Sequence, residues 1–174
     1  MITPRLRLQG DFDVTVAFRD FRCTIPDGLD GSIHLVVEFE SDDLAECRIY
    51  RSFNRFHPEQ GDESTCTAGV FRSIQGQRQF NYPAVPPEES TAGRLRFVRR
   101  GEVLYYLYAE NDSSHFRLIH KEKVGTADVR PGSLRLVVET NREGLTEVVW
   151  KSIEIRTGGI RGKIVPPRLS NVNE

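Results

Sequence analysis

The chain has 174 residues, a length that suits one domain with a buried core. Hydrophobic residues make up 38% and charged residues 28% of it, a composition typical of a globular protein rather than a disordered one. The formal net charge of -1 gives no overall attraction to nucleic acid. The longest apolar runs span only a few residues, so we expect no membrane-spanning segment.

Alternation of apolar and polar residues predicts β-strands from the start of the chain. In residues 11–21 every second side chain from Phe12 to Phe18 is apolar, which is typical of a strand with one buried face. The same alternation recurs in residues 32–40, and residues 44–53 continue in a more polar extended pattern. Turn-forming Pro, Gly and Asp residues separate these runs.

The middle of the chain combines two strands with two loops. Residues 54–65 predict an exposed loop, and residues 66–74 and 77–82 predict strands around a turn at Gln75 and Gly76. Residues 83–90 contain three prolines, which lack the amide donor that a central strand needs. We therefore expect that segment to be a connection that crosses a sheet edge.

Residues 93–119 predict a meander, because three short β-type runs are joined there by two tight turn signals. A second crossing connection follows over residues 124–131. Residues 133–140 and 145–156 then predict two strands joined by a hairpin turn at residues 141–144.

No window of the sequence shows sustained helical periodicity, and no repeat of fixed period is evident. Roughly ten to twelve short strands separated by Gly and Pro turns indicate an all-β protein. We expect a two-sheet antiparallel β-sandwich of the jelly-roll kind. Residues 1–157 are expected to form this single domain, and residues 158–174 a C-terminal tail or a linker to a neighbouring domain.

Four phrases of the sequence carry a resemblance to a known superfamily. They are Gly-Asp-Phe-Asp-Val-Thr-Val at 10–16, Leu-Arg-Phe-Val-Arg-Arg-Gly at 95–101, Asn-Asp-Ser-Ser-His-Phe at 111–116, and Val-Val-Trp-Lys-Ser-Ile-Glu-Ile at 148–155. With these phrases the chain resembles the concanavalin A-like lectin/glucanase superfamily, and most closely its bacterial domain families of unknown function. The resemblance covers most of residues 6–156 and implies a β-sandwich, with carbohydrate binding among the expected functions and an extracellular or cell-envelope location.

Catalytic motifs are weak in this sequence. Glycosidases of the superfamily carry carboxylates at alternate positions of one strand, and the nearest candidates are Glu38 and Glu40. The phrase around them departs from the family pattern and runs directly into a turn, so we interpret it as a solvated strand end. No nucleophile elbow, phosphate-binding loop or zinc-protease motif is present. We expect a protein that is not an enzyme, with a divergent glycoside hydrolase as the less favoured alternative.

A ligand-binding surface is predicted on the meander. Tyr106 and Tyr108 share one face of their strand and could stack on the apolar face of a sugar. Arg96, His115 and Arg117 on adjacent strands could bind its hydroxyl groups. The alternative is that the tyrosine rings belong to the core or to ordinary cross-strand packing.

Metal and cysteine chemistry give secondary expectations. Carboxylates clustered in turns could supply the oxygen ligands of a calcium site, although Asp residues commonly form turns without a metal, and the candidates are Asp27, Asp30, Asp42 and Asp43. No other cofactor is expected. The three cysteines fit small, partly buried strand residues, and the alternative is one disulfide between Cys47 and Cys66.

Two functional hypotheses follow for the chain as a part of a larger bacterial protein. The first is a noncatalytic carbohydrate-binding module whose partner is a polysaccharide or glycan. The second is a structural or protein-interaction sandwich without a small ligand. Exposed tyrosines that line a groove would favour the first hypothesis, and buried rings would favour the second.

Overall fold

The computed structural model describes residues 2–24, 30–40, 46–54, 65–83, 90–140 and 143–163, and within these ranges it contains ten strands and no helix. The strands are β1 (Arg5–Thr24), β2 (Asp30–Glu38), β3 (Glu46–Asn54), β4 (Thr65–Ile74), β5 (Gln77–Pro83), β6 (Gly93–Arg100), β7 (Val103–Glu110), β8 (Arg117–Lys123), β9 (Arg135–Thr140) and β10 (Leu145–Lys163). None of the described residues belongs to a helix that could cross a membrane.

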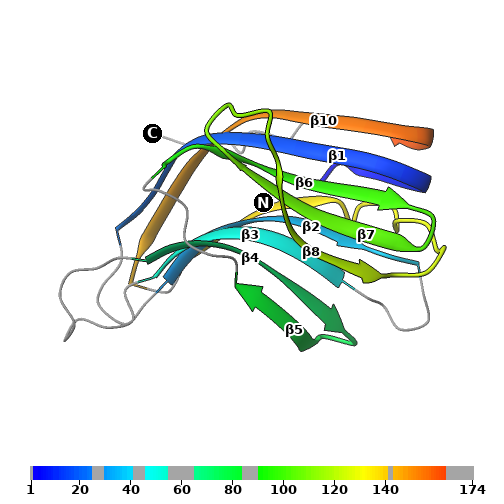
Figure 1. Ribbon diagram of the computed structural model, residues 1–174, viewed down its shortest axis with the longest axis horizontal. Coiled ribbons are helices and arrows are strands. Elements are labelled where there is room, and N and C mark those ends of the chain that lie inside the picture. The colour runs from blue at the N-terminus through cyan, green and yellow to red at the C-terminus, as the bar shows by residue number, and fades with distance from the viewer. Residues whose placement is uncertain are drawn as a thin grey trace, which may run out of the picture.

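The strands form two five-stranded antiparallel sheets that are stacked as two layers (Figure 1). One sheet has the order β10-β1-β6-β7-β8, and the other has the order β5-β4-β3-β2-β9. The predicted all-β, two-sheet sandwich is confirmed. The predicted meander is confirmed as well, because β6, β7 and β8 are consecutive neighbours in the first sheet.

Alternation of side chains places one face of the β10-β1-β6-β7-β8 sheet in the core. In β6 and β7 buried residues alternate with partly exposed ones along almost the whole strand. Aromatic rings fill much of the space between the sheets: Phe12 of β1 stacks on Phe39, and the ring of Phe97 meets that of Tyr106 edge to face. The opposite face of the β10-β1-β6-β7-β8 sheet carries polar side chains on β1 and β10 and some apolar ones on β6 and β7.

The two longest strands extend beyond their predicted bounds. The strand expected over residues 11–21 runs from Arg5 to Thr24, and the strand expected over residues 145–156 continues to Lys163. β1 and β10 pair with each other along this length, with Arg5 opposite Lys163. The division of the chain at residue 157 stays a prediction, but that point lies inside a paired strand.

A buried polar cluster bridges the two sheets. Tyr106 of β7 donates a short hydrogen bond to Glu122 of β8, and Arg72 of β4 donates to the same carboxylate at 3.1 Å. The thiol of Cys47 on β3 lies 3.9 Å from Glu122, and burial raises its pKa to about 12. Burial also raises the pKa of Tyr106 well above its usual value. These groups connect strands of both sheets through one carboxylate.

The alternative of a Cys47–Cys66 disulfide is wrong, because Cys47 is a free, buried cysteine. The strand register explains why. Cys47 pairs with Arg72 near one end of the β3–β4 ladder, whereas Cys66 pairs with Phe53 near the other end. Cysteines at opposite ends of a ladder are too far apart to be bridged.

Candidate functional site

Polar side chains of three neighbouring strands meet on the outer face of the β10-β1-β6-β7-β8 sheet. In β1, Val14 and Val16 are fully buried, so the alternate residues point away from the core. The ladder registers place Thr15 of β1 directly between Arg96 of β6 and Glu154 of β10. Side chains directly opposite one another on antiparallel strands share a face and lie close together.

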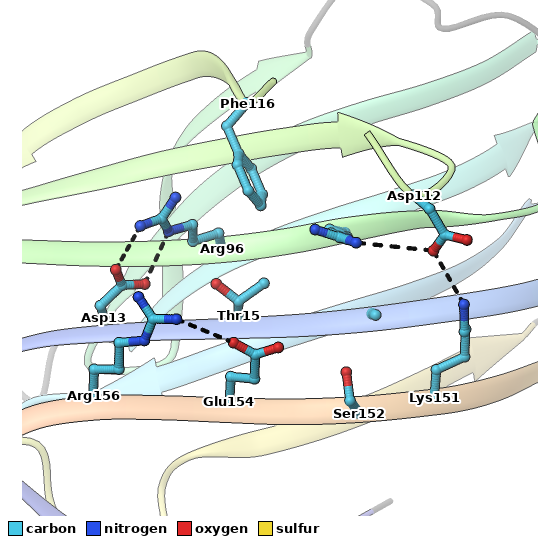
Figure 2. A pocket seen from close by; sticks show the side chains of 11 residues that line it. Asp13, Thr15, Arg96, Asp112, Phe116, Lys151, Ser152, Glu154 and Arg156 are labelled. Atoms are coloured by element: carbon cyan, nitrogen blue, oxygen red, sulfur yellow. Dashed lines mark hydrogen bonds and ion pairs between the residues drawn. The ribbon is translucent and has the colours of Figure 1, made fainter. Parts of the chain in front are cut away.

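This outer face is hollowed into a pocket of about 230 Å³, which we call the outer groove. Its short uncharged side chains are Thr15, Ala17 and Ser152, and the others are charged except for the aromatic ring of Phe116. Figure 2 shows Thr15 and Ser152 between two charged groups at opposite ends of the groove. The hollow therefore arises where small residues of β1 and β10 lie beside long side chains.

Arg96 and its neighbours form one end of the groove. The guanidinium of Arg96 donates two hydrogen bonds to the carboxylate of Asp13, at 2.9 and 2.5 Å. The same guanidinium lies 4.8 Å from the ring centre of Phe116, in a cation–π contact. The hydrogen bond to Asp13 raises the pKa of Arg96. Nearby, Arg156 forms an ion pair of 3.6 Å with Glu154 (Figure 2).

The other end of the groove holds two cations and one carboxylate. Lys151 of β10 donates to Asp112 at 3.0 Å, and Arg94 of β6 lies 3.9 Å from the same oxygen. Asp112 and Phe116 both belong to the loop between β7 and β8, which reaches over the β10-β1-β6 part of the sheet (Figure 1). The hydrogen bond from Lys151 lowers the pKa of Asp112.

An irregularity in the β1–β10 ladder places Lys151 in this position. Ala17 pairs with Ser152 and the next residue, Phe18, pairs with Trp150, so Lys151 is left as the extra residue of a β-bulge. Lys151 and Ser152, although adjacent in sequence, both line the outer groove. A bulge re-aims one side chain in this way without ending the strand.

The predicted tyrosine platform needs correction. Tyr106 is 0% exposed and Tyr108 is 4% exposed, because their face of β7 is the core face. Neither ring can stack on a ligand at the outer surface. The alternative interpretation, in which both rings belong to the core, is the one that the burial supports.

The three polar residues of the predicted surface lie in different places. Arg96 lines the outer groove. His115 is exposed in the β7–β8 loop, where its backbone N–H donates to Ser113. Arg117 begins β8 opposite Tyr108 and does not line the groove. The structure therefore groups Arg96 with residues of β1, β10 and the loop rather than with the two tyrosines.

Sequence reasoning missed several residues of the groove. Asp13 and Thr15 were visible as the polar half of the alternation in β1, and Phe116 as the aromatic that follows His115. Lys151 gave no such signal, because simple alternation places it on the opposite face from Ser152 and only the bulge brings both to the groove. Beside the groove, Tyr105 and Leu107 line a shallow depression on the same outer face together with Arg96.

The two catalytic candidates are each paired with a cation, and most of the metal candidates lie outside the described residues. Glu38 and Glu40 are engaged in ion pairs with Arg130 at 2.9 Å and Arg7 at 2.5 Å. Asp27, Asp42 and Asp43 lie outside the described residues, and Asp30 begins β2. Within the described ranges, His, Cys, Asp and Glu side chains form no group of three or more that could hold a metal ion. The calcium site stays a prediction.

Comparison with known sequences gives one family. Residues 1–174 match the family described as "Protein of unknown function (DUF1583) C domain". No curated protein matches the chain. The resemblance to the concanavalin A-like superfamily stays a prediction, and the β-sandwich architecture agrees with it.

Proposed function

Because the chain belongs to the DUF1583 C-domain family, whose function is unknown, we propose a function from the outer groove itself. The domain is a noncatalytic module that binds a polysaccharide or glycan on the outer face of its β10-β1-β6-β7-β8 sheet. The observation that carries the proposal is the composition of the groove. Short hydroxyl side chains lie between two groups of charged ones, with an aromatic ring at one end.

These residue types suit a sugar. Hydroxyl groups of a sugar pair with charged and hydroxyl side chains, and its C–H faces pack on aromatic rings. Phe116 and Tyr105 provide aromatic surface on the outer face, in place of the buried Tyr106 and Tyr108. The shallow depression beside the groove gives room for a chain longer than one sugar unit.

The pairing of the carboxylates supports binding rather than hydrolysis. Asp13, Asp112 and Glu154 each lie next to a cationic side chain of the groove. The hydrogen bond from Lys151 lowers the pKa of Asp112, whereas the general acid of a glycosidase has to hold a proton. A carboxylate that is held by a guanidinium serves to position that guanidinium.

Affinity gel electrophoresis against a panel of soluble polysaccharides tests the proposal. The wild-type domain should be retarded by at least one polymer, and Ser152→Phe, which fills the groove, should remove the retardation. Glu147→Phe is the matched control, because it adds the same ring to the same strand outside the groove and should bind as the wild type does.

Two results would contradict the proposal. One is the absence of retardation by every polymer in the panel. The other is retardation of Ser152→Phe equal to that of the wild type, with circular dichroism showing that the variant is folded. Either result would leave the protein-interaction sandwich as the better hypothesis.

A further inference from the structure

The loop end of the outer groove contains more positive than negative charge. Lys151 and Arg94 are both directed at one oxygen of Asp112, at 3.0 and 3.9 Å. Both cations come from strands, whereas the carboxylate comes from the loop between β7 and β8. The two cations are therefore carried by strands of the sheet, and the anion next to them belongs to the connecting segment; Figure 2 shows Lys151 and Asp112.

Of the two cations, Arg94 has the poorer hydrogen-bond partners. Its distance of 3.9 Å to Asp112 is beyond hydrogen-bonding range. Its buried Nε has no hydrogen-bond partner in the described part of the chain. A guanidinium carries five donors in a planar fork that fits a carboxylate, so Arg94 has capacity for a better acceptor than Asp112.

The hydrogen bond that holds Asp112 to Lys151 lies at the protein surface. The side chain of Asp112 is 75% exposed, and that of Lys151 is 41% exposed. Ion pairs between solvent-exposed side chains are weak and are screened by salt. The hydrogen bond from Lys151 lowers the pKa of Asp112, so the loop presents a carboxylate rather than a carboxylic acid at neutral pH.

We propose that the outer groove binds a uronate sugar, whose carboxylate replaces that of Asp112 between Lys151 and Arg94. The inference rests on the proposed function and specifies its ligand class. Without ligand, the carboxylate of Asp112 occupies the position that the carboxylate of an acidic sugar takes when it binds. The sugar ring lies over Thr15 and Ser152, whose hydroxyl groups face its own.

The same geometry makes Asp112 a competitor of the ligand. A uronate has to displace the loop carboxylate before it reaches both cations. A neutral sugar has no carboxylate that could take the place of the Asp112 carboxylate, so its binding should depend far less on the charge of Asp112. Removal of the Asp112 charge should therefore tighten the binding of acidic polymers only.

Titration calorimetry with polygalacturonate and with its neutral methyl ester tests the inference. Asp112→Asn should bind polygalacturonate about threefold more tightly than the wild type, as expected for release of an exposed ion pair. Lys151→Met should bind it about tenfold more weakly, because a charged hydrogen bond to the ligand is lost. Binding of the methyl ester should not respond to Asp112→Asn.

Matched controls come from an exposed ion pair elsewhere. Lys123 and Glu102 lie 4.0 Å apart and do not line the groove. Lys123→Met and Glu102→Gln change the net charge as the test variants do, and both should bind polygalacturonate as the wild type does. Equal effects from test and control variants would mean that only overall charge matters, and would overturn the inference.

The outcomes separate the inference from the proposed function. Retardation by neutral polymers without any affinity for polygalacturonate overturns the uronate inference and leaves the binding module standing. Preference for a sulfated glycan that contains no uronate over polygalacturonate overturns the choice of carboxylate. If Asp112→Asn binds polygalacturonate as tightly as the wild type does, the inference that Asp112 competes with the ligand carboxylate is overturned. Absence of binding to any glycan overturns both proposals.

Discussion

Glu139 on β9 is a carboxylate whose ionisation depends on its neighbours in the folded state. His34 lies 3.3 Å from one of its oxygens, and Arg48 donates to the other at 2.6 Å. The hydrogen bond with His34 and the charge of Arg48 lower the pKa of Glu139 to about 2. A carboxylate with a depressed pKa stabilises the fold above its unfolded pKa, and that contribution is lost as the pH falls towards the folded value.

We therefore expect acid to weaken the protein through Glu139 between about pH 4.5 and pH 2. Glu139→Gln should lower the free energy of unfolding by about 1 kcal/mol at pH 7, a value discounted because the side chain is 48% exposed. The difference from wild type should shrink at pH 2.5. Urea unfolding at both pH values measures it, and an equal difference at both would contradict the assignment. Glu143→Gln, in the exposed turn before β10, is the control.

The tyrosines of β7 show what the sequence predicts for a single residue and what it does not. The alternation correctly places Tyr106 and Tyr108 on one face and Tyr105 on the other. It does not say which face is buried, because both faces of β7 carry large apolar or aromatic side chains. Which face of β7 is buried depends on the packing of the opposite sheet and on Glu122. This carboxylate gives the Tyr106 hydroxyl an acceptor inside the protein.

At the scale of elements, Gly31 is a close contact between β2 and the strands that cover it. A Cβ at Gly31 would lie 2.4 Å from the hydroxyl oxygen of Thr146 on β10 and 2.7 Å from the sulfur of Cys23 on β1. Real side chains do not approach so closely, so one of the strands would have to shift. Only the absence of a side chain permits this packing.

We expect Gly31→Ala to destabilise the domain by about 1–3 kcal/mol, the range for overpacking of a tight site. Thr146→Ala should restore part of that loss in the double variant, because it removes the nearest contacting atom. Gly158→Ala on β10 meets open space and should change the free energy of unfolding by less than about 0.5 kcal/mol. Denaturant unfolding of the four proteins measures these values. Equal stability of Gly31→Ala and wild type would contradict the packing described.

Element positions were predictable where alternation is regular and turns are marked by Gly. The β4–β5 and β6–β7 turns contain Gly76 and Gly101, both with positive φ, and the strands beside them were expected at nearly the observed bounds. β1 and β10 were predicted too short because register shifts interrupt their pairing. A bulge shifts the alternation of apolar and polar residues by one position. The sequence pattern therefore predicts the end of a strand at a point where the strand continues.

At the scale of the whole molecule, the two sheets are linked by the carboxylate of Glu122. Arg72 and Cys47 reach it from one sheet, and Tyr106 reaches it from the other. The side chains of Arg72 and Glu122 are only 17% and 13% exposed. Loss of one partner of a largely buried pair leaves the other charge uncompensated.

We expect Arg72→Met to lower the free energy of unfolding by about 2–3 kcal/mol. Combination with Glu122→Gln should recover part of this loss, since no unpaired charge remains between the sheets. Lys123→Met, which breaks an exposed pair at 4.0 Å, should cost less than about 0.5 kcal/mol. Strict additivity of Arg72→Met and Glu122→Gln in urea unfolding would mean that the two side chains are not coupled.

The pairing of β1 has a consequence for the synthesis of the protein. Its residues are synthesised before those of the other described strands, yet one of its two neighbours, β10, is the last of these strands to be made. Contacts between segments so far apart in the chain form late and slow the folding of a domain. A nascent chain that still lacks residues 145–163 therefore carries a long unpaired edge on β1, which another chain could join. The edge of β1 becomes paired only after β10 has been synthesised.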